Sequence, residues 1–232
     1  MKKYELTNET IEYKGKKLYR IKALIDFGNV EKGARGGFVE KEENLSMSGN
    51  AWVCDNARVC DNARVCGDAN VCGDAFVSDN AQVSGDAFVC GNAWVCDNAR
   101  VCGDANVCGN AWVCDNAQVS GDARVSGNAQ VSGDARVCGG ANVCGDANVC
   151  GDAQVDKSIN YAVIKGFGTC YRSTTFFRCQ DKTVKVSCGC FLGTIDEFRN
   201  QVKNTRGGKI AKEYLMIADL MEIHFSEDEY DD

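Results

Sequence analysis

The chain has 232 residues, with 26 Lys and Arg against 33 Asp and Glu, and a net charge of −7 at pH 7. Most of the negative charge lies in residues 50–155, which hold thirteen Asp, five Arg and no Glu or Lys. This acidic character disfavours nucleic acid as a partner. No apolar run approaches the length of a membrane span, and the N-terminus lacks the apolar region of a signal peptide. We therefore expect a cytoplasmic protein without membrane contact, whose sixteen Cys are reduced.

Residues 1–43 are expected to form an N-terminal β cap. Two apolar segments, 11–13 and 18–21, flank Lys14-Gly15-Lys16-Lys17, which predicts a hairpin. Gly33, Gly36 and Gly37 then indicate an irregular loop. Leu45 and Met47 are predicted to take the two inward positions of the repeat that follows, so we place the start of the repeat domain at residue 44.

Residues 44–155 are dominated by a hexapeptide of the form Asn/Asp-Ala-x-Val-Cys/Ser-Gly/Asp. Ala recurs at every sixth position from Ala51 to Ala153 and Val from Val53 to Val155, eighteen times each. In an extended segment Ala and Val point to the same side, because they are two residues apart. A short strand and a corner in every repeat predict a three-sided parallel solenoid of about six coils, with Ala and Val inside and flanking segments capping both ends.

The corner of each repeat is restricted in composition. The position before Ala holds only Asn, Asp or, once, Gly140, and the position before that holds only Gly or Asp. Asn, Asp and Gly enter the left-handed αL region at low cost. We therefore expect a left-handed backbone in the position before Ala.

Residues eighteen apart should stack on one wall of the solenoid. One outward column brings together Arg58, Phe76, Trp94 and Trp112, and a second contains Trp52 and Phe88. Exposed aromatic side chains favour a contact surface for a protein partner, for the C-terminal domain or for a further copy in a dimer or trimer. The alternative is that stacked aromatics only stabilise the ladder. We take these six residues as the candidate binding face.

Two other columns leave alternatives open. Twelve Cys occupy the outward position after Val, in columns such as Cys54, Cys72, Cys90 and Cys108, and their interchange with Ser favours a merely small residue over soft-metal binding or redox cross-linking. A corner column contains Asp61, Asp79, Asp97 and Asp115. Turn formation accounts for these Asp residues, with calcium binding and mimicry of a phosphate row as alternatives.

Residues 156–225 are expected to form a small α+β domain, followed by a disordered acidic tail at 226–232. Three strands are predicted at 161–164, 174–177 and 184–187, with a turn at 180–182 between the last two. A capping box, Thr194-Ile195-Asp196-Glu197, predicts a helix, and a second helix is expected at about 209–221. Zinc is not expected, because Cys170, Cys179, Cys188 and Cys190 lack the paired spacing of zinc ligands.

The repeat resembles the left-handed parallel β-helix of the hexapeptide-repeat superfamily, which implies the handedness of the coil. The segments 32–40 and 44–46, together with 188–198, are similar to bacterial and phage hexapeptide proteins labelled as transferases or as polymer-forming. Phage association implies a host-directed role, such as blocking a defence protein. Many members of the superfamily are acyltransferases that use acyl-CoA and a His base, commonly as trimers, whereas the one His here, His224, lies beyond the repeats. We therefore predict a non-enzymatic scaffold that binds a protein without a cofactor, with a hexapeptide-type acyltransferase as the alternative.

Overall fold

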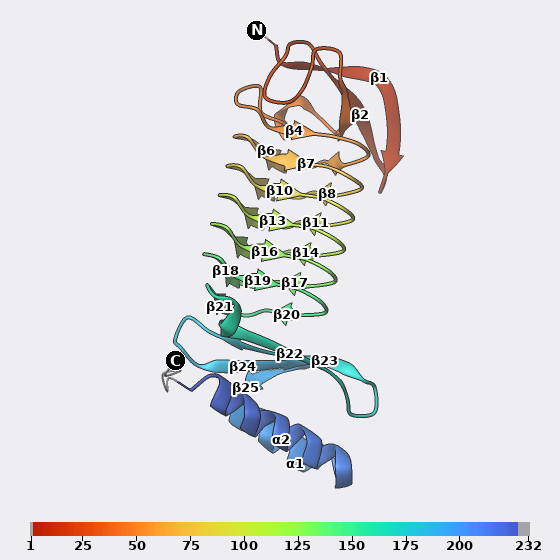
Figure 1. The fold of residues 1–232 in the computed structure, drawn as a ribbon. Helices are drawn as coiled ribbons and strands as arrows, with labels where there is room; N and C mark the ends of the chain where they lie inside the picture. The colour runs from red at the N-terminus through yellow and green to blue at the C-terminus, as the bar shows by residue number, and fades with distance from the viewer. Residues whose placement is uncertain (1, 227–232) are drawn as a thin grey trace.

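The structure is a computed structural model that describes residues 2–226, and its elements form a rod with a β cap at one end and an α+β domain at the other (Figure 1). The rod has three parallel walls. One consists of β4 Trp52–Val53, β7 Asn70–Val71, β10 Phe88–Val89, β13 Asn106–Val107, β16 Arg124–Val125 and β19 Asn142–Val143. The second consists of β5 Arg58–Val59, β8 Phe76–Val77, β11 Trp94–Val95, β14 Trp112–Val113, β17 Gln130–Val131 and β20 Asn148–Val149. The third consists of β6 Arg64–Val65, β9 Gln82–Val83, β12 Arg100–Val101, β15 Gln118–Val119, β18 Arg136–Val137 and β21 Gln154–Val155.

The interior of the rod confirms the predicted inward positions. Val89 pairs with Val107 on the next coil, and both are 0% exposed. Every repeat Ala from Ala51 to Ala153 is likewise buried. Ala and Val are small enough for three walls to meet along a narrow axis, so the six-residue period does produce a mainly β, parallel solenoid.

The solenoid starts earlier than residue 44 and in a different register from the predicted one. Val39 pairs with Val59 and Leu45 bridges Val65, so the walls extend about two thirds of a coil before β4. Leu45 takes the Val position and is buried, whereas Met47 is 36% exposed, so its predicted inward placement was wrong. The cause is length: Leu45 and Val53 are eight residues apart instead of six, and the two extra residues loop outward.

The N-terminal cap contains the predicted hairpin, formed by β1 Tyr4–Tyr13 and β2 Lys16–Ala23, followed by β3 Arg35–Val39 and a short 3-10 helix, Glu42–Asn44. Gly36 and Gly37 lie inside β3 and not in the predicted loop. A Cβ on Gly37 would lie 2.5 Å from the carbonyl oxygen of Ala57, so glycine is needed for β3 to cross the first coil closely. Tyr4 Oη and Lys3 Nζ donate to the carbonyl oxygens of Leu45 and Ala51, both at 2.9 Å, and cover this end of the rod.

The left-handed residue of each corner is one position earlier than predicted. Positive φ occurs in the Gly/Asp position, as in Gly103 (70°) and Asp97 (58°), and in no described residue of the position before Ala. Side chains in the position before Ala make hydrogen-bonded ladders instead: Asn80 Nδ2 donates to Asn98 Oδ1 at 3.1 Å, and Asn98 Nδ2 to Asn116 Oδ1 at 3.2 Å. Side-chain pairing between coils therefore explains that restriction better than backbone conformation does.

The C-terminal domain is a four-stranded antiparallel sheet with two helices. Its strands are β22 Tyr161–Phe167, β23 Arg172–Arg178, β24 Val184–Cys188 and β25 Phe191–Thr194, after a 3-10 helix at Ser158–Asn160. The helices are α1 Ile195–Thr205, which begins at the predicted capping box, and α2 Gly208–His224. The fourth strand, β25, was missed because four residues next to a helix start carry too little periodicity. Of the predicted tail at 226–232, only Ser226 lies within the described residues.

The sheet separates the rod from the helices (Figure 1). Phe177 and Cys179 belong to the apolar core of the rod, whereas Phe176 and Val186 pack with α1 and α2. Asn148 on the last coil donates its backbone N–H to Thr175 Oγ1 at 2.9 Å. The domain therefore caps the open edge of the solenoid, as predicted for a flanking segment. Within residues 2–226, neither helix has the length and apolar character that a membrane crossing requires.

Candidate functional site

The predicted aromatic column is present on the wall formed by β8, β11 and β14. Trp94 pairs with Phe76 on one side and with Trp112 on the other. The ring centroids are 5.4 Å apart for Phe76 and Trp94 and 5.6 Å apart for Trp94 and Trp112. Tilted and edge-to-face contacts at these distances are favourable, so the three rings support one another across successive coils.

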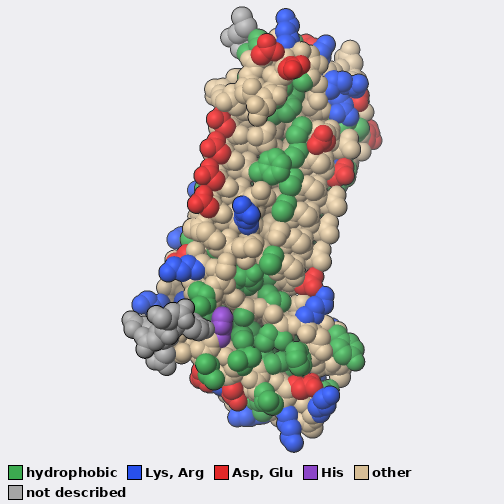
Figure 2. Space-filling model, in the orientation of Figure 1, with side chains coloured by type: hydrophobic (Ala, Val, Ile, Leu, Met, Phe, Trp, Pro, Cys, Tyr) green, Lys and Arg blue, Asp and Glu red, His purple; other side chains and the backbone are tan. Residues whose placement is uncertain are grey.

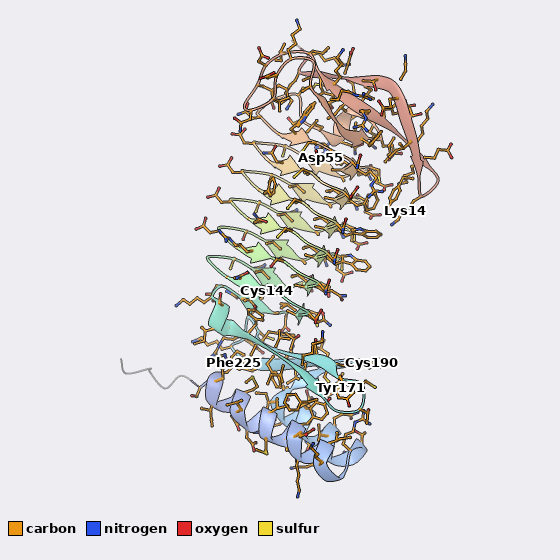
Figure 3. The ribbon with its side chains drawn as sticks, turned by 45° about the vertical axis from the view of Figure 1, so that its right-hand side comes forward. Lys14, Asp55, Cys144, Tyr171, Cys190 and Phe225 are labelled. Carbon is orange, nitrogen blue, oxygen red and sulfur yellow. The ribbon has the colours of Figure 1, made fainter. Side chains whose placement is uncertain are left out.

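The hairpin of the N-terminal cap covers the first part of this column. It folds down along the rod, and Lys14 lies at its tip beside the wall (Figure 3). The Tyr13 ring packs edge-on against Phe76 at 5.0 Å, and Lys14 Nζ lies 4.1 Å from the ring centroid of Trp94. Phe76 is only 2% exposed as a result. The column thus receives the N-terminal hairpin and not the C-terminal domain.

Arg58 also belongs to this covered part. Its guanidinium carbon lies 4.2 Å from the Tyr13 ring centroid, and its Nη2 donates to the carbonyl oxygen of Asp74 at 3.0 Å. Its Nε is buried and has no hydrogen-bond partner among the described residues. Arg58 therefore stacks under the hairpin and is not available as a free contact residue.

Trp94 and Trp112, which we call the aromatic strip, are the part of the column that reaches solvent. Trp94 is half-buried, and Trp112 is 42% exposed. Trp112 Nε1 donates to Cys96 Sγ at 3.2 Å, which anchors the indole to the neighbouring coil. The strip is an apolar surface whose two rings are held by contacts within the rod.

Trp52 and Phe88 lie on a different wall and do not join the strip. Trp52 is 5% exposed because Tyr4 and Phe27 pack on it, with ring centroids at 6.4 and 5.4 Å. Phe88 is 37% exposed between two Asn residues on the neighbouring coils. The six residues predicted as one binding face therefore divide into a covered group, the aromatic strip and an isolated Phe88.

Acidic residues form rows along the edges of the rod. One row consists of Asp68, Asp86, Asp104 and Asp122. Figure 2 shows a row of acidic side chains along one edge of the rod. A second row, Asp61, Asp79, Asp97 and Asp115, lies at the corner beside the aromatic strip and has a left-handed backbone. Its carboxylates accept from backbone N–H groups of the next coil, for example Asp97 from Asp115 at 3.3 Å. This second row therefore has the turn-forming role expected from the sequence, and it gives the strip an acidic border.

The four Cys of the C-terminal domain do not converge on one point. Cys179 is buried against the last coil, and burial raises its pKa to about 12. Cys188 is half-buried, and Cys170 and Cys190 are exposed. Among the described residues, Cys179 approaches Asp152 and Asp181 within 4.8 Å but forms no ligand group with the other three thiols. The arrangement does not bring these Cys together as zinc ligands.

A pocket of about 260 Å³ opens between the sheet and the helices of this domain. Arg172, Arg206, Cys188 and Tyr214 line it. A Cβ on Gly168 would lie 2.3 Å from Tyr214 Oη, so the left-handed Gly168 (φ 71°) makes room for this side chain. Neither Arg forms an ion pair with another described residue, so the pocket suits a small anionic group. Sequence reasoning missed it because its residues come from three strands and two helices.

His224 has structural contacts at the end of α2. Its Nε2 lies 3.2 Å from the carbonyl oxygen of Ile159, and its ring packs on Phe225 with centroids 4.8 Å apart. Phe225 is marked in Figure 3 at the rod-facing end of the helix. His224 thus joins α2 to the linker after the solenoid, and no coil brings a second described His near it.

Comparison with known proteins supports the repeat architecture. The family described as the YdcK beta solenoid repeat matches residues 81–97, 117–133 and 129–145, all inside the walls described above. A search of curated proteins found no match. Among solved structures, the chain is similar to a Bacillus cereus protein described as a candidate acetyltransferase, with 12% identity over 80% of this chain and 95% of that one and a TM-score of 0.20, values too low to support any argument about activity. The repeat match and the in-register coils agree on the architecture of a hexapeptide-repeat β-solenoid for this part of the chain.

Proposed function

We propose that the chain is a non-enzymatic scaffold that binds a protein partner through the aromatic strip. The observation that carries this proposal is that Trp112 is 42% exposed on a wall where the hairpin of the chain itself covers Phe76. Trp is enriched among residues that dominate binding energy at interfaces. A rigid wall presents such residues without the loss of conformational entropy that a flexible loop undergoes on binding.

The surroundings of the strip define the chemistry of the partner. Asp97 and Asp115 border it on one side, and Lys14 borders its upper end. An apolar surface with a mainly basic rim complements this arrangement. A second copy of the chain is a poorer match, because its own strip has the same acidic border. The resemblance to phage proteins favours a host protein, such as a defence component, as the partner.

Affinity capture from a bacterial lysate tests the proposal. The wild-type chain is expected to retain one protein in stoichiometric amount, and Trp112→Asp to reduce its recovery by at least about tenfold, as expected for a binding hot spot. Phe88→Asp is the matched control, because Phe88 is similarly exposed but lies on another wall. Equal recovery with wild type and Trp112→Asp would contradict the role of the strip.

Two further measurements separate the alternatives. Light scattering that gives a dimer or trimer dissociated by Trp112→Asp would assign the strip to self-association. Acetyl-CoA turnover that disappears in His224→Ala would replace the scaffold by the acyltransferase. A monomer without turnover, together with a captured partner, is the result that the scaffold predicts.

A further inference from the structure

The wall that contains β4, β7, β10 and β13 carries four thiols in an unbroken row. Cys54, Cys72, Cys90 and Cys108 follow four Val residues that pair in register from coil to coil. We call this set the thiol ladder. Figure 2 shows a column of side chains of the hydrophobic class, which includes Cys, along the visible face of the rod. Ser126 ends the ladder before Cys144, whose Sγ lies instead 3.6 Å from the hydroxyl oxygen of Tyr161.

Successive thiols of the ladder are close enough to act together. The Sγ atoms of Cys54 and Cys72 and a carboxylate oxygen of Asp55 all lie within 4.8 Å of one another. Cys54 Sγ also donates to the carbonyl oxygen of Val71, the residue before Cys72, at 3.6 Å. All four side chains of the ladder are half-buried and reachable from solvent.

This spacing fits an ion between two sulfurs better than a bond between them. In an in-register stack every equivalent atom, Cβ included, repeats at the strand spacing of about 4.8 Å, whereas a disulfide brings its Cβ atoms to about 3.5–4.5 Å. Oxidation would therefore pull two coils together. Metal–thiolate bonds are about 2.3 Å long, so two such bonds in line span about 4.6 Å without movement of the backbone.

The shape of the ladder also selects the kind of ion. Zinc requires four ligands in a tetrahedron, whereas each gap in a straight row offers two sulfurs. Soft ions that accept two thiolates, such as Cu(I), match this ligand set. We propose that the thiol ladder binds soft monovalent ions of the Cu(I) type, one between Cys54 and Cys72 and one between Cys90 and Cys108.

The charge balance of such loading follows from the ligands. Binding of one ion between two thiols converts both to thiolates and releases two protons. Filling both pairs releases four protons and adds two positive charges. The net change is two negative charges, one at each two-coordinate ion.

The third wall provides a control built into the same chain. Its outward position after Val alternates between Cys and Ser, as Cys66, Ser84, Cys102, Ser120 and Cys138. These thiols occupy the same position in the repeat but are never neighbours. A requirement for any small residue explains both walls equally, whereas an ion held between two thiols needs thiols on neighbouring coils.

The test counts the ions retained by the reduced full chain. Silver(I) nitrate serves as a redox-inert probe for Cu(I), reduced glutathione competes as a monothiol, and native mass spectrometry reads the stoichiometry. Relative to wild type, Cys54→Ser and Cys72→Ser should each lose one ion, and the double variant Cys72→Ser/Cys90→Ser should lose two. The double variant Cys66→Ser/Cys102→Ser should lose none. Ser occupies the same position at Ser78, Ser84 and Ser126, so these variants are expected to fold.

Other outcomes overturn the proposal. An equal loss of silver ions from the two double variants would show that isolated thiols bind silver as well as neighbouring ones do. If the wild type retained no silver in the presence of glutathione, the ladder would bind silver no more tightly than a monothiol does. Zinc retained with the same dependence on the ladder would exclude the two-coordinate class. A mass lower by two hydrogens per gap after aerobic purification, absent from Cys72→Ser/Cys90→Ser, would assign the ladder to disulfide formation. The inference is independent of protein binding, so Trp112→Asp should keep the full silver stoichiometry.

Discussion

The ammonium group of Lys14 lies 4.1 Å from the ring centroid of Trp94, although 80 positions separate the two residues in the sequence. The tip of the N-terminal hairpin thus reaches the middle of the rod. A cation over an indole ring contributes about 0.5–1 kcal/mol at a partly exposed site. Together with the Tyr13 ring on Phe76, this contact determines which aromatics of the column are covered.

We expect Phe76→Ala to be far more destabilising than Phe88→Ala. Both Phe residues occupy the same position of the repeat, but Phe76 is 2% exposed under the hairpin and Phe88 is 37% exposed. Loss of the buried ring should reduce the free energy of unfolding by about 3–5 kcal/mol, and loss of the exposed ring by less than about 1 kcal/mol. Urea unfolding followed by Trp fluorescence measures both, and similar costs would contradict the covering role of the hairpin.

The corner geometry predicts opposite behaviour for two adjacent residues. Gly103 has φ 70°, and a Cβ there would lie 2.9 Å from the backbone nitrogen of Gly121, so Gly103→Ala should cost at least about 1–2 kcal/mol. Asp104 has no positive φ and stands between Asp86 and Asp122 in the acidic row. Asp104→Ala removes like-charge repulsion and should change stability by less than about 0.5 kcal/mol.

Thermal unfolding of the two variants checks this prediction. Because screening by salt weakens repulsion between exposed charges, added salt should stabilise the wild type more than Asp104→Ala. A larger loss of stability for Asp104→Ala than for Gly103→Ala would contradict a left-handed backbone at the Gly/Asp position and would favour the position before Ala.

The contact between Asp152 and Lys185 should make docking of the C-terminal domain dependent on pH. Lys185 Nζ lies 2.6 Å from Asp152 Oδ1, and this hydrogen bond lowers the pKa of Asp152 and raises that of Lys185. The stability contributed by the charged Asp152 is fully present above its unfolded pKa of about 3.9, and it is lost as the pH falls through its lowered folded pKa. The stability contributed by the charged Lys185 is fully present below its unfolded pKa of about 10.4, and it is lost as the pH rises through its raised folded pKa. Both side chains are partly exposed, so screening by solvent keeps the expected contribution of the pair to less than about 1 kcal/mol.

Two spectroscopic signals separate the domain from the rod. All three Trp lie in the solenoid, and both described α-helices lie in the C-terminal domain. Lys185→Gln should lower the unfolding temperature followed by circular dichroism at 222 nm near pH 7, and this difference should vanish below the folded pKa of Asp152. Lys203→Gln is the control, since Lys203 has no ion pair among the described residues. Equal effects of the two variants at all pH values would rule out the contribution of the pair.

The helix start at Thr194 should contribute measurably to the C-terminal domain. Glu197 donates its backbone N–H to Thr194 Oγ1 at 3.2 Å, and Glu197 Oε2 accepts from the Thr194 backbone N–H at 2.8 Å. Thr194→Ala should cost about 1 kcal/mol in the unfolding followed at 222 nm. Thr205→Ala is the matched control, because its hydroxyl only bonds the Gln201 carbonyl within the last helical turn. If Thr194→Ala left the stability measured at 222 nm unchanged, water would be replacing the Thr194 hydroxyl as the helix cap.

The repeat region could be predicted closely because its physics is local. Each coil contacts only the coils before and after it, so the position of Val107 follows from a six-residue period and from nothing distant. The capping box at Thr194 was predictable for the same reason. The αL position was missed by one residue, since Asn, Asp and Gly suit both a left-handed backbone and a side-chain ladder, and composition does not distinguish them.

The six-residue repeat was enough to predict the three-walled rod, its Ala and Val interior and the columns of outward side chains. Which of these outward side chains remain exposed depends on how the N-terminal cap packs on the rod. Phe76 and Trp112 occupy equivalent positions of the repeat, yet one is buried and the other exposed, because the hairpin reaches the first and not the second. How far a flanking segment reaches along a rod depends on its length and on packing between residues remote in sequence, and no repeat period encodes that.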